Sequence, residues 1–386
     1  MVYQQDRDAV ANRVSPGTAR ALERRAVVAD SQGLPASRAN QYLEQINRDH
    51  DDDCTSSLFS PLAVEWGEPF FPRSLMSAVL LDGTQIASDI RAELAGEVKS
   101  MTAAGLRPGL AVVLVGNNPA SEIYVRGKVK SCEELGIYSE KVTPPVSSST
   151  DELCAIVESL NRRDEIDGIL VQLPLPDHVD AKRVLLTVSP AKDVDGFHPV
   201  NVGYLSTRRP GLVPCTPAGV MEILRRSGIP VAGRDAVVVG RSDIVGKPAA
   251  MLLLNANATV TVCHSKTHDL PAVCRRADIL VAAIGRAGMV TKNFVKPGAA
   301  VLDVGINRVT DRAEFERLFA GNRKREETFA AKGSTLVGDV HPEVAEIAGA
   351  FTPVPGGVGP LTIAMLMSNT IQAARMRRGA KQPVAV

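Results

Sequence analysis

Short apolar runs alternate with longer amphipathic stretches from residue 76 onward. The runs at 109–115 and 166–172 contain too few polar residues to expose one face, so each is predicted to be a strand buried on both sides. Helices are expected nearby, over 85–104 and 121–135. The rhythm resumes near Thr216, with strands expected at 236–239, 258–263, 279–283 and 300–303 and a helix at 244–255. Such alternation is typical of an α/β fold, in which helices cover a mostly parallel sheet.

Composition and pattern divide the chain into three parts. Residues 1–75 contain no lysine, and Ser, Pro and Gly clusters interrupt their periodicity. They are expected to be a poorly ordered N-terminal extension, either an appendage or the product of an over-long gene start. A first α/β domain is expected over 76–215, completed by a C-terminal helix over 357–386, and a second over 216–356. A charged insert at 308–333 is expected to be helical and to form a surface excursion.

The overall composition excludes several classes of protein. A net charge of +1 over 386 residues gives no bulk attraction to nucleic acid or to an anionic membrane. No apolar run approaches the ~18 residues that span a bilayer. The six cysteines lack zinc-site spacing, so we expect no metal, reduced thiols and a cytoplasmic protein.

Tyr124 and Lys128 are four residues apart in one predicted helix, and Ser121 precedes the tyrosine by three. This spacing places a hydroxyl, a phenol and an amine on one helical face, where together they could carry out proton chemistry. Most such pairs are solvated helix decoration, so the spacing alone leaves both interpretations open.

A strand, a tight turn and a helix are expected over 237–248, where a Rossmann unit holds a pyrophosphate. Gly240 matches the first glycine of the G-x-G-x-x-G fingerprint, but Ser242 and Val245 replace the others, so a plain turn remains possible. The next strand ends in Cys-His-Ser-Lys-Thr, without the acid that holds an NAD ribose. Together with Arg241, this favours NADP over NAD, unless Arg241 and Lys266 are simply exposed.

Three further loops are unusual for a protein surface. Gln172 lies where a strand meets Leu-Pro-Leu-Pro, at the sheet edge where α/β ligands bind. Asp193 and Asp195 fall in a tight Lys-Asp-Val-Asp-Gly turn. The loop at 352–360 combines prolines, which fix φ, with glycines, which let a ligand approach the backbone. Each alone could be a strand-end cap, an Asx turn or an interdomain loop.

Taken in order, these motifs resemble the bifunctional methylenetetrahydrofolate dehydrogenase/cyclohydrolase (FolD) family over roughly residues 76–380. The resemblance implies two α/β domains flanking a cleft, the first binding folate and the second a Rossmann-like NADP domain with a parallel sheet. It implies NADP-dependent oxidation of 5,10-methylenetetrahydrofolate to the 5,10-methenyl cation, followed by hydrolysis to 10-formyltetrahydrofolate. This chemistry belongs to one-carbon metabolism and purine biosynthesis. A cytoplasmic homodimer, assembled through the cofactor domain, is also implied by resemblance.

The resemblance also assigns roles to individual residues. Lys128 is the expected general acid/base, and Tyr124 flanks it. Gln172 is expected to position the Lys128 amine and adjust its basicity, and Asp195 is expected to bind the pterin. Other expected substrate contacts are Ser121, Pro355, Gly356 and Gly357. Expected cofactor contacts are Gly240, Arg241, Ser242, Ser265, Thr216 and Ile306.

Two rival functions remain at this point. A catalytically idle nucleotide-binding module would have lost Lys128 or Asp195, and both are present. A monofunctional dehydrogenase is the nearer rival, although retention of Lys128 and Gln172 favours both activities. For hydride transfer, the protein has mainly to hold the nicotinamide and the folate carbon in near contact. This requirement accords with the absence of a metal-site motif in the sequence.

Overall fold

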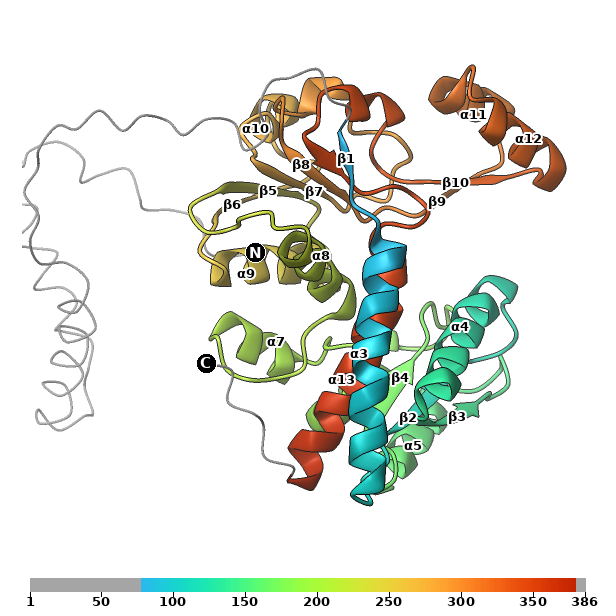
Figure 1. Cartoon of the computed structure of the whole chain (residues 1–386). Coiled ribbons are helices and arrows are strands. Elements are labelled where there is room, and N and C mark those ends of the chain that lie inside the picture. The colour runs from blue at the N-terminus through green and yellow to red at the C-terminus, as the bar shows by residue number, and fades with distance from the viewer. Residues whose placement is uncertain (1–77, 380–386) are drawn as a thin grey trace, which may run out of the picture. The chain divides into compact units, whose positions relative to one another are not determined.

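The computed structural model describes residues 78–379 (Figure 1). The expected extension at 1–75 and the last residues of the segment 357–386 lie outside this range. None of the helices between residues 78 and 379 combines the length and apolar character that a bilayer crossing requires.

A three-stranded parallel sheet forms the first half of the described chain, in the order β3-β2-β4. Its strands are β2 (Gly109–Val113), β3 (Tyr138–Val142) and β4 (Gly168–Val171). Alternate residues of β2 enter different clusters: Leu110 packs with helix α3 (Gly83–Ala103), whereas Ala111 packs with helix α5 (Thr150–Asn161). Helices thus cover both faces, which explains why this strand contains no polar residue.

A six-stranded sheet follows, in the order β1-β11-β8-β7-β5-β6, and every pair in it is parallel. The strands are β1 (Val79–Leu80), β5 (Asp235–Val239), β6 (Thr259–Cys263), β7 (Ile279–Ala282), β8 (Ala300–Asp303) and β11 (Ala350–Phe351). The predicted α/β class is therefore confirmed. The sequence interpretation had grouped Val79 and Leu80 with the first domain, but they pair with Ala350 and Phe351 in the second sheet.

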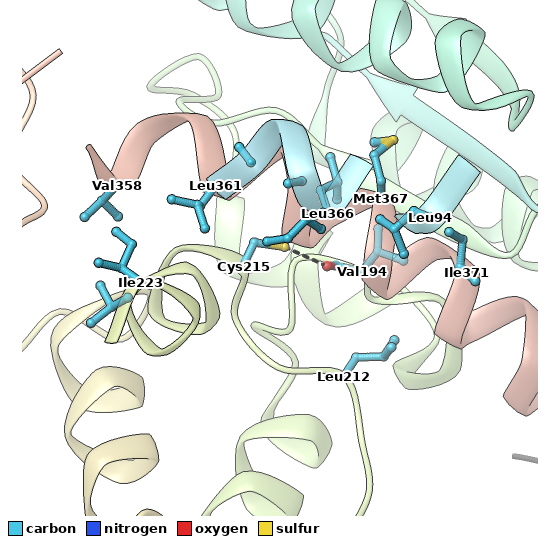
Figure 2. Packing of buried hydrophobic residues seen from close by; sticks show 14 of the residues in the cluster. Leu94, Val194, Leu212, Cys215, Ile223, Val358, Leu361, Leu366, Met367 and Ile371 are labelled. Carbon is cyan, nitrogen blue, oxygen red and sulfur yellow. Dashed lines mark hydrogen bonds between the residues drawn. The ribbon is translucent and has the colours of Figure 1, made fainter. Parts of the chain in front are cut away.

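The last helix, α13 (Val358–Arg378), packs against α3 and against α8 (Cys215–Arg226). Figure 2 shows its Leu361, Leu366 and Met367 among apolar side chains from both neighbours. Its basic end is also anchored, because Arg377 and Arg378 pair with the buried Asp167 at 2.6 and 2.7 Å. One helix therefore contributes to the cores associated with both sheets.

The insert folds as an antiparallel ribbon, β9 (Asn307–Val309) with β10 (Thr335–Val337), that carries two helices (Figure 1). These are α11 (Arg312–Phe319) and α12 (Arg323–Lys332), which confirms the expected helical character. The other helices are α4 (Pro119–Leu135), α6 (Ala181–Thr187), α7 (Pro199–Ser206), α9 (Gly246–Asn255) and α10 (Leu270–Cys274). Short 3-10 turns occur at η1 (Pro190–Lys192), η2 (Lys292–Phe294) and η3 (Pro342–Glu346).

Candidate active site

Helix α4 carries the hydroxyl, phenol and amine that the sequence placed on one face. Ser121 is buried, Tyr124 is 47% exposed and Lys128 is partly buried. Val125 packs into the core, and Gly127 lies against Ile363 of α13, where an added Cβ would be 3.4 Å from the Ile363 side chain. These two packed residues, Val125 and Gly127, fix the orientation of α4 about its own axis.

Lys128 contacts Gln172 at the carboxyl end of β4. Its Nζ donates a hydrogen bond of 2.9 Å to Gln172 Oε1, and Gln172 Nε2 donates one of 2.7 Å to Leu173 O. The second bond fixes which way the amide points, because the donor end is already committed to the backbone. Gln172 therefore presents an acceptor to the amine, and the Leu173–Pro174 peptide bond that follows is cis.

The turn that carries Asp193 and Asp195 uses the two carboxylates differently. Asp193 is buried and accepts hydrogen bonds from His198 N at 2.8 Å and Asn201 Nδ2 at 2.9 Å. No residue between 78 and 379 donates a hydrogen bond to the Asp195 carboxylate. Burial raises the pKa of Asp195 to about 6, opposed by the charge of Lys128 and assisted by that of Asp193. Asp195 is thus a carboxylate available to a ligand, close enough to Lys128 to interact electrostatically.

Asn369 supports this turn and was not anticipated from sequence. Its Nδ2 donates to Val194 O and Val213 O, both at 2.8 Å. Cys215 Sγ donates to the same Val194 carbonyl at 3.2 Å (Figure 2). An asparagine in the buried stripe of α13 is the sequence signal for such a role, because a buried amide requires partners.

A pocket of about 200 Å³ brings residues from distant segments together. Tyr124 lines it with Ile306, and so do Pro355, Gly356 and Gly357 of the predicted substrate loop. The remaining lining residues are Asp303, Val304, Gly305, Leu336, Pro353, Val354, Val358, Gly359 and Pro360. Predicted substrate contacts and one predicted cofactor contact therefore share one cavity.

Asp303, at the end of β8, organises one wall of this pocket. It is buried and accepts backbone hydrogen bonds from Gly305, Asp339 and Val340 at 2.8–3.0 Å. Burial raises its pKa to about 7, although the three amides favour the charged form. Gly338 is required beside it, because a Cβ there would lie 1.7 Å from Asp303 Oδ2.

Asp339 extends the same arrangement to a second loop. Its carboxylate accepts the N–H groups of Ile284, Gly285 and Arg286 at 2.5–2.8 Å, and Asn307 Nδ2 at 2.9 Å. This role of Asp339 could not be predicted from the sequence, because the bonded amides are more than 50 residues away.

The predicted phosphate turn connects β5 to α9. Gly240 has a φ of +135°, and a Cβ there would lie 2.1 Å from Ala283 O. Gly246 packs back onto the turn, where its Cβ would lie 2.3 Å from Gly240 O. Ser242 Oγ accepts hydrogen bonds from Val245 N and Gly246 N, both at 3.2 Å, at the start of α9. This tight strand-to-helix turn fits a nucleotide phosphate, and the displaced glycine preserves the close approach.

The other predicted cofactor residues lie nearby in the fold. Ser265 and Lys266 are exposed just after β6, which pairs with β5, and Arg241 is exposed in the turn. Thr216, on α8, exchanges a hydrogen bond of 2.9 Å with Thr362 of α13. Within residues 78–379, no group of three His, Cys, Asp or Glu side chains could hold a metal ion.

Two family-level similarities cover these regions. Residues 81–195 match the tetrahydrofolate dehydrogenase/cyclohydrolase catalytic domain, and residues 214–378 match the NAD(P)-binding domain of the same enzymes. The chain belongs to the tetrahydrofolate dehydrogenase/cyclohydrolase family. This membership confirms the family, the two-domain α/β fold and the paired enzyme classes expected from the sequence.

Individual members of the tetrahydrofolate dehydrogenase/cyclohydrolase family resemble the chain over nearly their whole length. It is 75% identical to the bifunctional protein FolD of Koribacter versatilis, covering 79% of this chain and 99% of that protein. Similarity to the Campylobacter jejuni FolD crystal structure reaches a TM-score of 0.71 at 44% identity, covering 78% and 100% of the two chains. The Trypanosoma brucei FolD structure, complexed with NADP cofactor and inhibitor, gives 0.71 at 40% identity, covering 79% and 100%.

Proposed function

We propose that this protein catalyses NADP-dependent oxidation of 5,10-methylenetetrahydrofolate and then hydrolyses the 5,10-methenyl product to 10-formyltetrahydrofolate. The observation that best supports both steps is the hydrogen-bonded Lys128–Gln172 pair beside the carboxylate of Asp195, to which no residue of the described range 78–379 donates a hydrogen bond. A binding module would not require an amine held in this way. The family membership gives the reaction type, and the residue roles that follow are our proposals, supported by the contacts described above.

Substrate binding is assigned to the carboxylate of Asp195 and to the loop at 355–357, called the glycine loop below. Asp195 would accept hydrogen bonds from the pterin amino and ring N–H groups, which a carboxylate suits. Ser121 and Tyr124 would form the wall from α4. Pro355, Gly356 and Gly357 would form a second wall, where the two glycines let the backbone approach the ligand.

The dehydrogenase step depends mainly on placement. Bound NADP⁺ supplies the hydride acceptor. Ile306 and Tyr124 line one cavity, so a nicotinamide beside the first and a folate beside the second would be in near contact. No general base is needed for the hydride itself, which leaves Lys128 available to orient the folate.

The cyclohydrolase step requires proton handling at Lys128 Nζ. A permanently charged amine would repel the cationic methenyl substrate, so we assign Lys128 a proton-shuttling role. Gln172 Oε1 holds Nζ in place without adding a charge, because an amide oxygen is a neutral acceptor. It accepts one N–H of the amine, and the other N–H groups remain for water and substrate. Lys128 would take a proton from the water as its oxygen bonds to the methenyl carbon, and would return that proton to N5 as the N5–carbon bond breaks. The remaining hydroxyl proton would leave to solvent as the formyl C=O forms.

The cofactor assignment is NADP rather than NAD. Gly240 and Ser242 would approach the pyrophosphate, while Arg241 and Ser265 would contact the 2′-phosphate. Both are exposed, and the strand end after β6 offers no carboxylate to repel that phosphate. Thr216 would contact the cofactor from α8.

Three broader features are also proposed. Formation of 10-formyltetrahydrofolate would supply one-carbon units to purine biosynthesis, and we place the protein in the cytoplasm. A homodimer through the cofactor domain is supported by β6, which ends its sheet and carries the 40% exposed Val262. Light scattering on the purified chain would test the dimer, and a monomer at micromolar concentration would contradict it.

One assay tests the central assignment. Purified protein is given 5,10-methylenetetrahydrofolate with NADP⁺ or NAD⁺, and methenyl formation and hydrolysis are followed separately. We expect both steps, with higher kcat/KM for NADP⁺. Lys128→Met should lower hydrolysis by about 10²–10⁴-fold, the usual contribution of a general acid/base, while NADP binding changes little. Oxidation without hydrolysis in the unaltered protein would indicate a monofunctional dehydrogenase and contradict the proposal.

A further inference from the structure

The insert is a packed unit with its own core. Phe315 stacks on Phe329 with ring centroids 4.4 Å apart, and Phe319 lies 5.6 Å from Phe315. Val309 and Val337 of the β9–β10 ribbon complete this cluster. The two helices are therefore held firmly to the ribbon. A side chain on either helix can hold the residue that it contacts in a defined position.

Arg325 of α12 reaches from this unit to the walls of the 200 Å³ pocket, called the folate pocket below because Tyr124 and the proposed substrate loop line it. Its Nη2 donates to Val354 O at 2.7 Å, and its Nη1 donates to Leu336 O at 3.0 Å and Thr335 Oγ1 at 3.1 Å. Val354 and Leu336 both line the pocket that also contains Tyr124. One guanidinium thus joins two wall segments that are separated in sequence.

The guanidinium of Arg325 is partly removed from water, which costs free energy unless protein atoms replace the lost hydrogen bonds. Its guanidinium lies over the Phe319 ring, 4.8 Å from the centroid, and burial lowers its pKa. None of its hydrogen-bond acceptors within residues 78–379 is a carboxylate, so two carbonyl oxygens and the Thr335 hydroxyl replace the water it loses. A partly buried guanidinium of this kind is stable only where its planar set of N–H donors matches the positions of its acceptors.

Other contacts fix the neighbouring parts of the same loops. Gly356 O accepts Thr84 N at 3.0 Å, and Thr352 Oγ1 accepts Asp303 N at 2.7 Å, on either side of Val354. Arg317 of α11 also donates to Ala287 O at 3.0 Å, in the loop that Asp339 organises. The insert therefore contacts the substrate loop and a loop of the cofactor domain.

We propose that Arg325 is a positioning residue for the folate pocket, through which the insert holds the Val354 and Leu336 walls at a fixed separation. The inference deepens the proposed function and rests on it for the identity of the ligand. Without Arg325, the Val354 carbonyl would lose its donor and the glycine loop would move away from the folate. Between described residues, Arg325 makes no hydrogen bond to the Gly240 turn, to Ile306 or to the loop that Arg317 contacts, so NADP binding should change little.

The test compares Arg325→Ala and Arg325→Lys with Arg323→Ala. Arg323 is a matched control because it is on the same helix, is 91% exposed and pairs with Glu327 one turn away. We expect Arg325→Ala to raise the folate KM about tenfold, the effect of losing a charge-assisted hydrogen bond, with the NADP⁺ KM within about twofold. Lysine retains the charge and one donor group, so Arg325→Lys should recover part of the loss, and Arg323→Ala should match the unaltered protein.

Hydrogen exchange of folate-free protein provides a readout independent of activity. Peptides covering 352–358 should exchange faster in Arg325→Ala, while peptides covering β5 should not change. An unaltered folate KM, or an equal rise in the KM of NADP⁺, would overturn the proposal. If the alanine variant does not fold, Arg325→Lys decides, because a KM and an exchange rate equal to those of the unaltered protein would overturn it. Lack of turnover in the unaltered protein would instead contradict the proposed function, and the exchange result would still judge the role of Arg325.

Discussion

Two pairs of aspartates organise the two regions of this molecule, and they are used in different ways. In the cofactor region, Asp303 and Asp339 each accept three backbone N–H groups and so hold loops together. In the catalytic region, Asp193 accepts one backbone N–H and one side-chain amide, but Asp195 has no donor among the described residues. A carboxylate saturated by amides stabilises a loop, whereas one without donors is available for a ligand.

Removing the most heavily hydrogen-bonded carboxylate should have the largest effect on stability. Asp339→Ala leaves three backbone amides and the Asn307 side chain without their acceptor. We expect the free energy of unfolding to fall by about 3–5 kcal/mol in urea titrations at pH 8. Asp311→Ala is the control, because this exposed N-cap accepts one N–H, from Glu314, and should cost about 1 kcal/mol. Equal losses for the two variants would show that Asp339 does not hold the loop.

A smaller change tests the bonded member of the catalytic pair. Asp193→Asn keeps the shape of the side chain but removes the charge that assists the bonds from His198 N and Asn201 Nδ2. The free energy of unfolding should fall by about 1–2 kcal/mol. Unchanged stability at pH 8 would mean that Asp193 contributes no more to the turn than a neutral acceptor does.

The pH dependence of turnover tests the free member of the pair. Because the pKa of Asp195 is about 6 and the charged form should bind folate, kcat/KM should fall by about tenfold between pH 8 and pH 5. Asp303, with a pKa of about 7, could add a second inflection. The profile of Asp195→Asn separates them, since the inflection near pH 6 should disappear in that variant. A flat wild-type profile across this range would contradict the role of a charged Asp195.

Much of the fold and the composition of the site could be predicted from local pattern. The strands expected at 236–239 and 300–303 and the α4 face follow from periodicity, and the place of Gln172 at a sheet edge follows from strand-end chemistry. The association of Gln172 with Lys128 is implied by the family resemblance alone. The difference between Asp193 and Asp195 could not, because it depends on where His198 and Asn201 place their donors. Pairing of β1 with β11 and the contact of Arg325 with Val354 depend on chain segments brought together only by folding.

The role of Asp195 is tested by the unfolding free energy of Asp195→Asn at pH 8, with folate turnover measured on the same sample. The folded-state pKa of Asp195, about 6, exceeds the unfolded value of about 3.9, so folded protein binds the proton more tightly. Stability from this group is therefore present at low pH and is lost as pH rises from about 4 to 6. Asparagine carries no charge to bury, so the variant should be about 1 kcal/mol more stable than wild type at pH 8, part of the cost a two-unit shift implies.

The gain should vanish near pH 4, where the carboxyl is protonated in the folded protein, and kcat/KM for folate should fall at least about a hundredfold at pH 8. Higher stability with lost turnover is the result we predict. Lower stability at pH 8, or turnover equal to that of wild type, would show that Asp195 holds the turn as Asp193 does and would contradict its assignment to the substrate.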